Sequence, residues 1–145
     1  MAVVVDTDVV SFLYKQDNRG GFYLPHLSNQ LPIISFMTLA ELERWTLAAD
    51  WGERKRQHLM KYLRRYTVYP VSALLCRKWA EVVDGARRRG RPIATSDAWI
   101  AATATLLDVP LLTHNAGDFE SEPGLNVFTN LSDRTLQPIC EPPQR

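Results

Sequence analysis

Val3-Val4-Val5-Asp6-Thr7-Asp8 is the stretch that decides the fold. Its three valines form a short apolar run, which predicts a buried strand. The run ends at a carboxylate, and a helix is expected directly afterwards, over about 8–14. A buried strand followed at once by a helix is the repeating unit of α/β proteins. The stretch therefore predicts that Asp6 follows the carboxyl end of a buried strand.

Strands and helices continue to alternate along the rest of the chain. Further strands are predicted at 32–36, 67–71, 110–113 and 126–128, with a loop at 18–21. The helices predicted between them cover about 38–51, 53–66, 75–89 and 96–107. This alternation predicts an α/β fold in which helices cover both faces of a parallel sheet.

Length and composition favour one globular domain. The chain has 145 residues, enough to bury a hydrophobic core without disulfides or metals. We expect the domain to span 1–132, with a polar, flexible tail at 133–145. No apolar run reaches the roughly 18 residues that a membrane span needs, and the first residues do not resemble a signal peptide. Cys76 and Cys140 form no disulfide or zinc motif, so we expect a cytoplasmic protein.

Four carboxylates are expected at one edge of the sheet. Asp6 follows the first strand, Glu41 lies in the first turn of the helix after the second strand, and Asp118 follows the strand at 110–113. Asp97 lies in the first turn of an alanine-rich helix, and joins them if that helix begins at the same edge. Ligands of parallel α/β sheets bind outside the carboxyl ends of the strands. The topology thus predicts a cluster of acids where a ligand would bind.

Each acid also has a purely structural interpretation. Asp6 could shape the turn between strand and helix. Asp118 could shape the loop after the strand at 110–113 in the same way. Glu41 could complete a capping box with Thr38. Asp97 could complement the helix dipole beside a Ser96 N-cap.

Together, however, the four carboxylates would repel one another unless a cation lay between them. A hard cation with oxygen ligands, Mg²⁺ or Mn²⁺, resolves that repulsion. Such ions catalyse phosphodiester hydrolysis by lowering the pKa of a water and polarising phosphoryl oxygens. No Ser–His pair and no glycine-rich phosphate loop offers a different chemistry, and we expect His114 to be an exposed loop residue. The acids therefore predict a metal-dependent phosphodiesterase.

Basic residues gather in the middle of the chain. Twelve of the 17 Lys and Arg residues lie between Arg54 and Arg91, where Glu81 and Asp84 are the only acids. This asymmetry predicts a polyanionic partner. The same residues could instead form two solvated helix faces, and those at 87–89 could complement the dipole of a helix C-terminus.

Five stretches resemble the PIN-domain family of nucleases, and the last two are particularly similar to VapC-type toxins. They run in the family's order over about residues 2–129. The stretches are Val3-Val4-Val5-Asp6-Thr7-Asp8, Ser35-Phe36-Met37-Thr38-Leu39-Ala40-Glu41-Leu42, Gly90-Arg91-Pro92-Ile93, Asp97-Ala98-Trp99-Ile100-Ala101-Ala102-Thr103-Ala104 and Thr113-His114-Asn115-Ala116-Gly117-Asp118-Phe119.

The resemblance implies a three-layer α/β/α fold with a short, mostly parallel sheet. It implies an endoribonuclease that depends on Mg²⁺ or Mn²⁺, forms a homodimer and is inhibited by a small cognate antitoxin. The catalytic, metal-binding acids that it implies are Asp6, Glu41, Asp97 and Asp118, of which Asp6 and Asp97 are the first choices as direct ligands. The polar residues that it implies around them are Thr7, Thr113 and Asn115. With RNA as substrate, the candidates for contacts to flanking phosphates are Arg54, Lys61, Arg64, Arg65, Arg87 and Arg88.

Two residues depart from the family's pattern. Asp8 stands where asparagine is usual, and either adds charge to the site or caps a helix; we expect the cap. His114 replaces a residue that is often arginine, which removes a fixed positive charge. Neither departure affects the four acids.

Three other functions stay open beside the toxin. One is a PIN nuclease of RNA processing outside any toxin–antitoxin pair, which the neighbouring gene would distinguish. Another is a non-catalytic RNA-binding or protein-interaction domain, which degenerate acids would mark. The last is a small-molecule-binding doubly wound domain, against which the missing phosphate loop argues.

Overall fold

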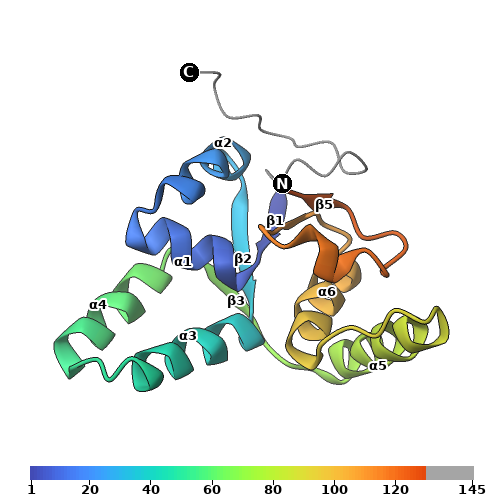
Figure 1. Cartoon of the computed structure of the whole chain (residues 1–145). Coiled ribbons are helices and arrows are strands. Elements are labelled where there is room, and N and C mark those ends of the chain that lie inside the picture. Colours follow the sequence, from blue (N-terminus) through green and yellow to red (C-terminus); the bar gives the residue numbers. More distant parts are fainter. Residues whose placement is uncertain (130–145) are drawn as a thin grey trace.

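A parallel sheet lies at the centre of the molecule (Figure 1). The computed structural model describes residues 1–129, so the domain end at 132 and the tail at 133–145 lie outside the described residues. The strands are β1 (Ala2–Val5), β2 (Leu31–Ser35), β3 (Thr67–Tyr69), β4 (Leu111–Leu112) and β5 (Val127–Phe128). They lie in the order β3-β2-β1-β4-β5, and each neighbouring pair is parallel. The parallel sheet is therefore confirmed, with β1 in the middle.

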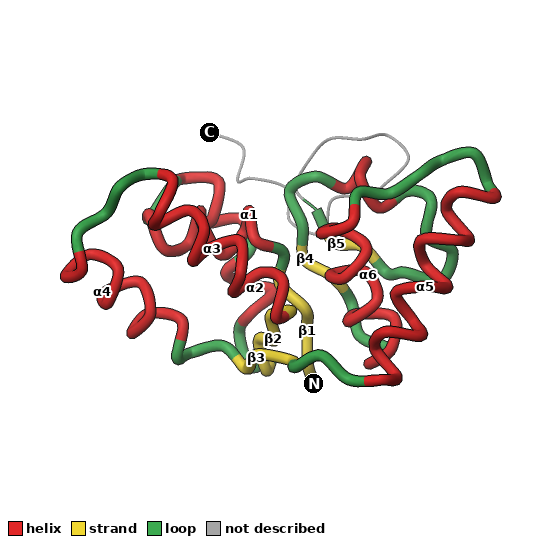
Figure 2. Tube along the Cα trace, turned by 90° about the horizontal axis from the view of Figure 1, so that it is seen from below, coloured by secondary structure: helices red, strands yellow, loops and turns green. Residues whose placement is uncertain are grey.

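Helices cover both faces of this sheet and complete three layers (Figures 1 and 2). One side carries α1 (Thr7–Lys15), α2 (Leu24–Leu27), α3 (Phe36–Ala48) and α4 (Glu53–Leu63). The other side carries α5 (Ala73–Arg88) and α6 (Thr95–Leu107). Two short 3-10 helices, η1 (Asn18–Phe22) and η2 (Ala116–Phe119), connect these elements. The three-layer α/β/α architecture is confirmed.

The opening valines divide the core between the two faces of the sheet. Val3 and Val5 pack in one cluster with Leu59 of α4, and Val4 packs in the other with Ile100 of α6. Successive side chains of a strand point to opposite faces, so a strand covered on both sides needs apolar residues at every position. The uninterrupted valine run meets that requirement.

The start of α3 differs from the prediction. The capping box of Thr38 and Glu41 is wrong, because Ser35 is the N-cap and its hydroxyl accepts the N–H of Met37 at 3.1 Å. β2 runs into α3 without a loop, so the last residue of the strand also caps the helix. Glu41 therefore does not cap α3, and its carboxylate accepts a hydrogen bond from the Thr7 hydroxyl instead.

Two other local predictions need correction. The predicted Ser96 cap is wrong, since α6 begins at Thr95 with Ala94 as its N-cap, and Ala94 makes no side-chain cap hydrogen bond. The predicted loop at 18–21 is the 3-10 helix η1, whose N-cap Asp17 accepts the N–H of Arg19. None of the described helices is both long and apolar enough to cross a membrane.

Candidate functional site: an acidic cavity at the sheet edge

An acidic cavity of about 360 Å³ opens at the carboxyl ends of the strands. The structure brings all four predicted acids to its wall, together with a fifth carboxylate. The acids that line it are Asp6, Asp8, Glu41, Asp97 and Asp118. Their convergence agrees with the parallel topology, whereas their metal-binding and catalytic roles stay predictions.

Asp6 is fixed from two sides where β1 ends. Its side chain is 6% exposed. Oδ1 accepts the N–H of Thr7 at 2.7 Å, and Oδ2 accepts the hydroxyl of the buried Thr113 at 2.6 Å. Thr113 therefore acts behind Asp6, as the residue that orients its carboxylate.

Glu41 is held by a neighbouring helix. The Thr7 hydroxyl donates to Glu41 Oε1 over 2.8 Å and lies 3.0 Å from the hydroxyl of the buried Thr38. These contacts join α1 to α3 at the cavity. Thr7 and Thr38 thus lie next to Glu41 and fix its neighbourhood. The sequence predicts this place for Thr7 and not for Thr38.

Asp8 adds charge to the cavity, and its predicted role as a helix cap is wrong. The N-cap of α1 is Asp6. Asp8 Oδ1 accepts the N–H of Val9, while Oδ2 accepts the N–H of His114 at 3.2 Å and the amide Nδ2 of Asn115 at 3.0 Å. Asp8 therefore ties the loop after β4 to the start of α1, and Asn115 lines the cavity as expected.

His114 is not the exposed loop residue that was expected. Its ring is partly buried and packs edge-on against Phe12, with 5.1 Å between ring centroids. Its Nδ1 lies 2.9 Å from the hydroxyl of Tyr23. These contacts of its ring place His114 behind the site, and it does not line the cavity.

The carboxylates perturb one another. Burial raises the pKa of Asp6 well above its usual range, and the charge of Asp8 raises it further. Burial raises the pKa of Asp8 to about 6, with the charges of Asp97 and Asp118 adding to the rise. Burial, Asp118 and Glu41 likewise raise the pKa of Asp97 to about 6. Like charges held this close in a partly buried cavity favour binding of a cation.

The donor set suits a small hard cation. Among residues 1–129, the wall of the cavity offers carboxylate, hydroxyl and amide oxygens and no histidine or cysteine, which is the donor chemistry of Mg²⁺ and Mn²⁺. Within residues 1–129, no three Asp, Glu, His or Cys side chains form a ready-made cage for a metal. Mg²⁺ commonly binds through one or two carboxylates and keeps several waters. The acids and the open space therefore fit such an ion.

Besides the buried Leu42, three further residues line the cavity that were not predicted from the sequence. Ser11 and Lys15 lie on α1, and Trp45 lies on α3. Helix spacing offers the signal, because residues four apart share a face. Ser11 and Lys15 repeat the spacing that begins at Thr7, and Trp45 stands four residues after Glu41.

The basic residues predicted to bind phosphates do not line this cavity. Arg54 and Lys61 lie on α4, whereas Arg87 and Arg88 lie on α5, on the opposite side of the sheet (Figure 1). Arg87 and Arg88 both pair with Asp84, at 3.1 and 2.7 Å. The basic residues of α4 and α5 are therefore close in the sequence but do not form one surface patch.

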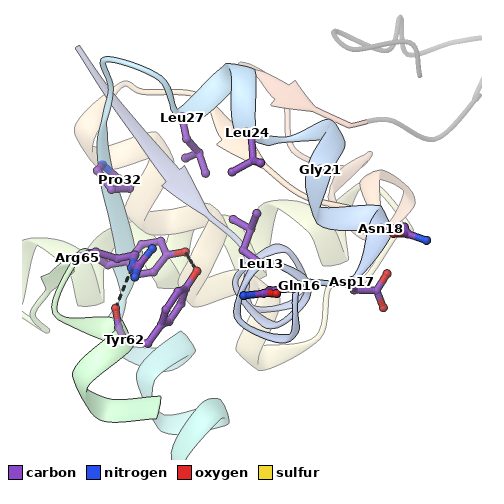
Figure 3. Close-up of a pocket in the computed structure, with 11 residues that line it drawn as sticks. Leu13, Gln16, Asp17, Asn18, Gly21, Leu24, Leu27, Pro32, Tyr62 and Arg65 are labelled. Carbon is purple, nitrogen blue, oxygen red and sulfur yellow. Dashed lines mark hydrogen bonds between the residues drawn. The ribbon is translucent and has the colours of Figure 1, made fainter. Parts of the chain in front are cut away.

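A second, mostly apolar cavity of about 530 Å³ lies between α1, η1, α2 and α4 (Figure 3). Arg65 lies at its wall, where Nε donates to the carbonyl of Tyr62 and the guanidinium covers the Tyr62 ring at 4.0 Å. Asp17 is the acid that lines it, and Arg19 already binds that carboxylate at 2.7 Å. The described residues that line this cavity include no cluster of acids, so they offer no comparable chemistry.

Comparisons with known proteins agree with this geometry. Residues 3–121 match the model of the PIN domain family. The chain is 28% identical over 124 residues to Ribonuclease VapC1 of Haemophilus influenzae (strain R2866), which covers 83% of this chain and 91% of that protein. It is 29% identical over 98 residues to Ribonuclease VapC4 of Mycobacterium tuberculosis (strain ATCC 25618 / H37Rv), which covers 66% and 75% of the two chains.

A solved structure shares the fold as well. VapBC-1 from nontypeable Haemophilus influenzae superposes with a TM-score of 0.77 and 27% identity, over 89% of this chain and 98% of the matched chain. The family model covers most of the chain and includes every acid of the cavity. The chain therefore belongs to the PIN-domain family.

Proposed function

We propose that the protein is a metal-dependent endoribonuclease and the toxin of a VapC-type toxin–antitoxin pair. The observation that carries the proposal is the convergence of five carboxylates in one cavity of a PIN-domain chain. The relatives named Ribonuclease VapC support RNA as the substrate. The similarity to a VapBC structure supports an antitoxin as partner, and a homodimer belongs to the same proposal.

In this proposal Mg²⁺ or Mn²⁺ is held by Asp6 and Asp97, with Glu41 and Asp118 completing the cluster. When bound, the ion lowers the pKa of a water and polarises the phosphoryl oxygens. Thr113 keeps one Asp6 oxygen in place.

The remaining side chains hold the site rigid or accept a proton. Thr7 holds Glu41 through its hydroxyl, and Asp8 orients Asn115 at the mouth of the cavity. Glu41 or Asp118, which complete the cluster, would accept the proton of that water.

The antitoxin is expected to block the site with a cation of its own. A pocket of five carboxylates is complementary to arginine, which pairs with carboxylates through two parallel hydrogen bonds. We therefore propose that the antitoxin places an Arg or Lys side chain among Asp6, Glu41, Asp97 and Asp118. A structure of the complex with no partner cation in that cavity would contradict this part of the proposal.

Metal-dependent cleavage of RNA tests the activity. The purified chain, free of any partner, is incubated with total RNA in millimolar Mn²⁺, in millimolar Mg²⁺ or in excess chelator. We expect cleavage with at least one of the two metals, none in chelator, and recovery when Mn²⁺ is restored. Cleavage that persists in chelator would indicate a contaminating ribonuclease or a different mechanism, and the absence of cleavage under all conditions would contradict the proposal.

A further inference from the structure

Lys15 and Trp45 form one corner of the acidic cavity. The Lys15 ammonium lies 4.5 Å from the centre of the Trp45 ring, a distance at which a cation is attracted to an aromatic face. Lys15 lies in the last turn of α1, and Trp45 lies one turn beyond Glu41 on α3. The contact therefore places a positive charge in the cavity that the carboxylates line.

No acid of the described residues takes up this charge in an ion pair. None of the salt bridges within residues 1–129 involves Lys15. Asp17 is close in sequence, but Arg19 binds it through two side-chain hydrogen bonds of 3.0 and 2.7 Å. Among the described residues that line the cavity, Lys15 is the one cation, and it is exposed. Its ammonium is thus accessible to a ligand.

A structural role accounts for part of this arrangement. A lysine in the last turn of a helix complements the helix dipole, and its methylene stem can cover an apolar ring. Lys55 makes the same kind of contact with Trp51, at 4.1 Å, and neither of these residues lines the acidic cavity. A lysine can therefore stack on a tryptophan away from the acidic cavity. The Lys55–Trp51 pair serves as a matched control for the Lys15–Trp45 pair.

The chemistry of the substrate explains the place of Lys15. A single strand of RNA carries a negative charge at each phosphate, and the wall of the cavity carries five carboxylates. A metal ion would offset the repulsion at the scissile phosphate, but the neighbouring phosphates need a cation of their own. A lysine already held against a ring loses less side-chain freedom when it binds.

We infer that Lys15 binds an RNA phosphate next to the scissile one, and that Trp45 is the positioning residue that holds the Lys15 ammonium there. The inference rests on the proposed function and assigns two residues to substrate binding. Because the contact is the same before and during the reaction, it strengthens binding of the substrate and leaves the chemical step unchanged.

Steady-state cleavage of a short RNA of defined sequence tests the inference. Lys15→Gln removes the charge and is expected to raise KM about tenfold, the effect of one lost charge-assisted contact, while kcat changes less than about twofold. The slope of log(kcat/KM) against log salt should become shallower by about 0.7. Lys15→Arg should restore most of the binding. Trp45→Leu should raise KM in part, and Trp45→Phe, which keeps a ring, should raise it less.

Two controls separate a phosphate contact from a general loss of charge or fold. Lys55→Gln removes the matched cation and should leave KM and the salt slope as in the wild type. For the wild type, KM should be higher for an RNA with one neutral methylphosphonate beside the cleaved bond than for the unmodified RNA. For Lys15→Gln, the two RNAs should give the same KM. Melting temperatures within a few degrees of wild type would exclude misfolding of the variants.

The outcomes distinguish the inference from the proposed function. If Lys15→Gln keeps the wild-type KM and salt slope while RNA is cleaved, the inference is overturned and the proposed function stands. If that variant weakens only the binding of a protein partner, Lys15 belongs to a protein interface and the inference is likewise overturned. If the wild type shows no metal-dependent cleavage, the proposed function is overturned, and the inference with it.

Discussion

Asp97 is the residue at which function and stability are expected to conflict. Burial and the charges of Asp118 and Glu41 raise its pKa to about 6, so its ionised form opposes folding when no metal is bound. Asp97→Asn removes that charge and keeps the side-chain shape. In chelator the variant should be more stable than wild type by about 1 kcal/mol, a modest value because Asp97 is partly exposed and screened by solvent. Melting curves measure this difference.

Mn²⁺ should reverse the order of stability of wild type and Asp97→Asn. A metal that binds only the folded state raises the melting temperature, and the variant lacks one of its proposed ligands. Wild type should therefore gain more from Mn²⁺ than Asp97→Asn. A variant that is less stable than wild type in chelator would instead favour the structural interpretation, in which Asp97 serves the N-terminus of α6.

The same pair of proteins predicts a pH dependence. Asp97 has a pKa of about 6 in the folded protein and about 3.9 when unfolded, so the folded wild type binds more protons between these values. Its unfolding free energy is lowered as pH rises through 6 and recovered as pH falls towards 4. The advantage of Asp97→Asn in chelator should thus be present at pH 7.5 and vanish near pH 4. An advantage that grows on acidification would contradict the assignment.

Single residues show how far the sequence alone predicts the site. Asp6, Glu41 and Asp118 could be predicted because parallel strands bring their carboxyl ends to one edge. Asp97 follows no strand, so its place depended on where its helix begins. Asp8 was misassigned, since its partners at 114 and 115 lie more than a hundred residues away. Lys15 and Trp45 were missed because neither is a metal ligand, and their contact depends on how α1 crosses α3.

At the scale of elements, the packing of η1 against α1 depends on one glycine. A Cβ on Gly20 would lie 3.1 Å from the backbone N of Leu13 and 3.1 Å from the backbone C of Phe12. Backbone atoms in a helix cannot yield as a flexible side chain can, so Gly20→Ala should push η1 from α1 and cost about 1–3 kcal/mol of unfolding free energy. Denaturant unfolding measures this loss.

The neighbouring glycine provides the control. A Cβ on Gly21 would meet nothing within 4 Å, so Gly21→Ala should change the unfolding free energy by less than about 0.5 kcal/mol. Equal effects of the two substitutions would show that the close approach at Gly20 does not determine the stability of this region.

Element positions were easier to predict than element ends. Apolar spacing located the strands and the main helices, because burial on the sheet dictates that spacing. The ends depend on which backbone N–H finds a partner, and Ser35 outcompetes the capping box at 38–41 because β2 leads directly into α3. The glycines at 20 and 21 favoured a loop, yet the Asp17 cap closes a 3-10 turn there.

At the scale of the whole molecule, the three-layer fold determines which residues that are distant in the sequence lie close together in space. The cavity collects acids from α1, α3, α6 and η2, although Asp6 and Asp118 stand at opposite ends of the domain. The same layering disperses the basic stretch, because the chain passes through β3 between α4 and α5 and places them on opposite sides of the sheet (Figure 1). Basic residues that are clustered in the sequence therefore form one surface patch only when their elements lie on the same side of the sheet.

RNA cleavage by Asp97→Asn, compared with Asp108→Asn, tests the central claim most directly. Both substitutions remove one aspartate charge from or beside α6, Asp97 in its first turn at the cavity and Asp108 at its C-cap. Asp108 has φ of 53°, a left-handed conformation that asparagine tolerates well. With Mn²⁺ and total RNA, we expect Asp108→Asn to cleave as wild type does and Asp97→Asn to lose activity by orders of magnitude. Undiminished cleavage by Asp97→Asn would contradict the assignment of the acidic cavity as the active site.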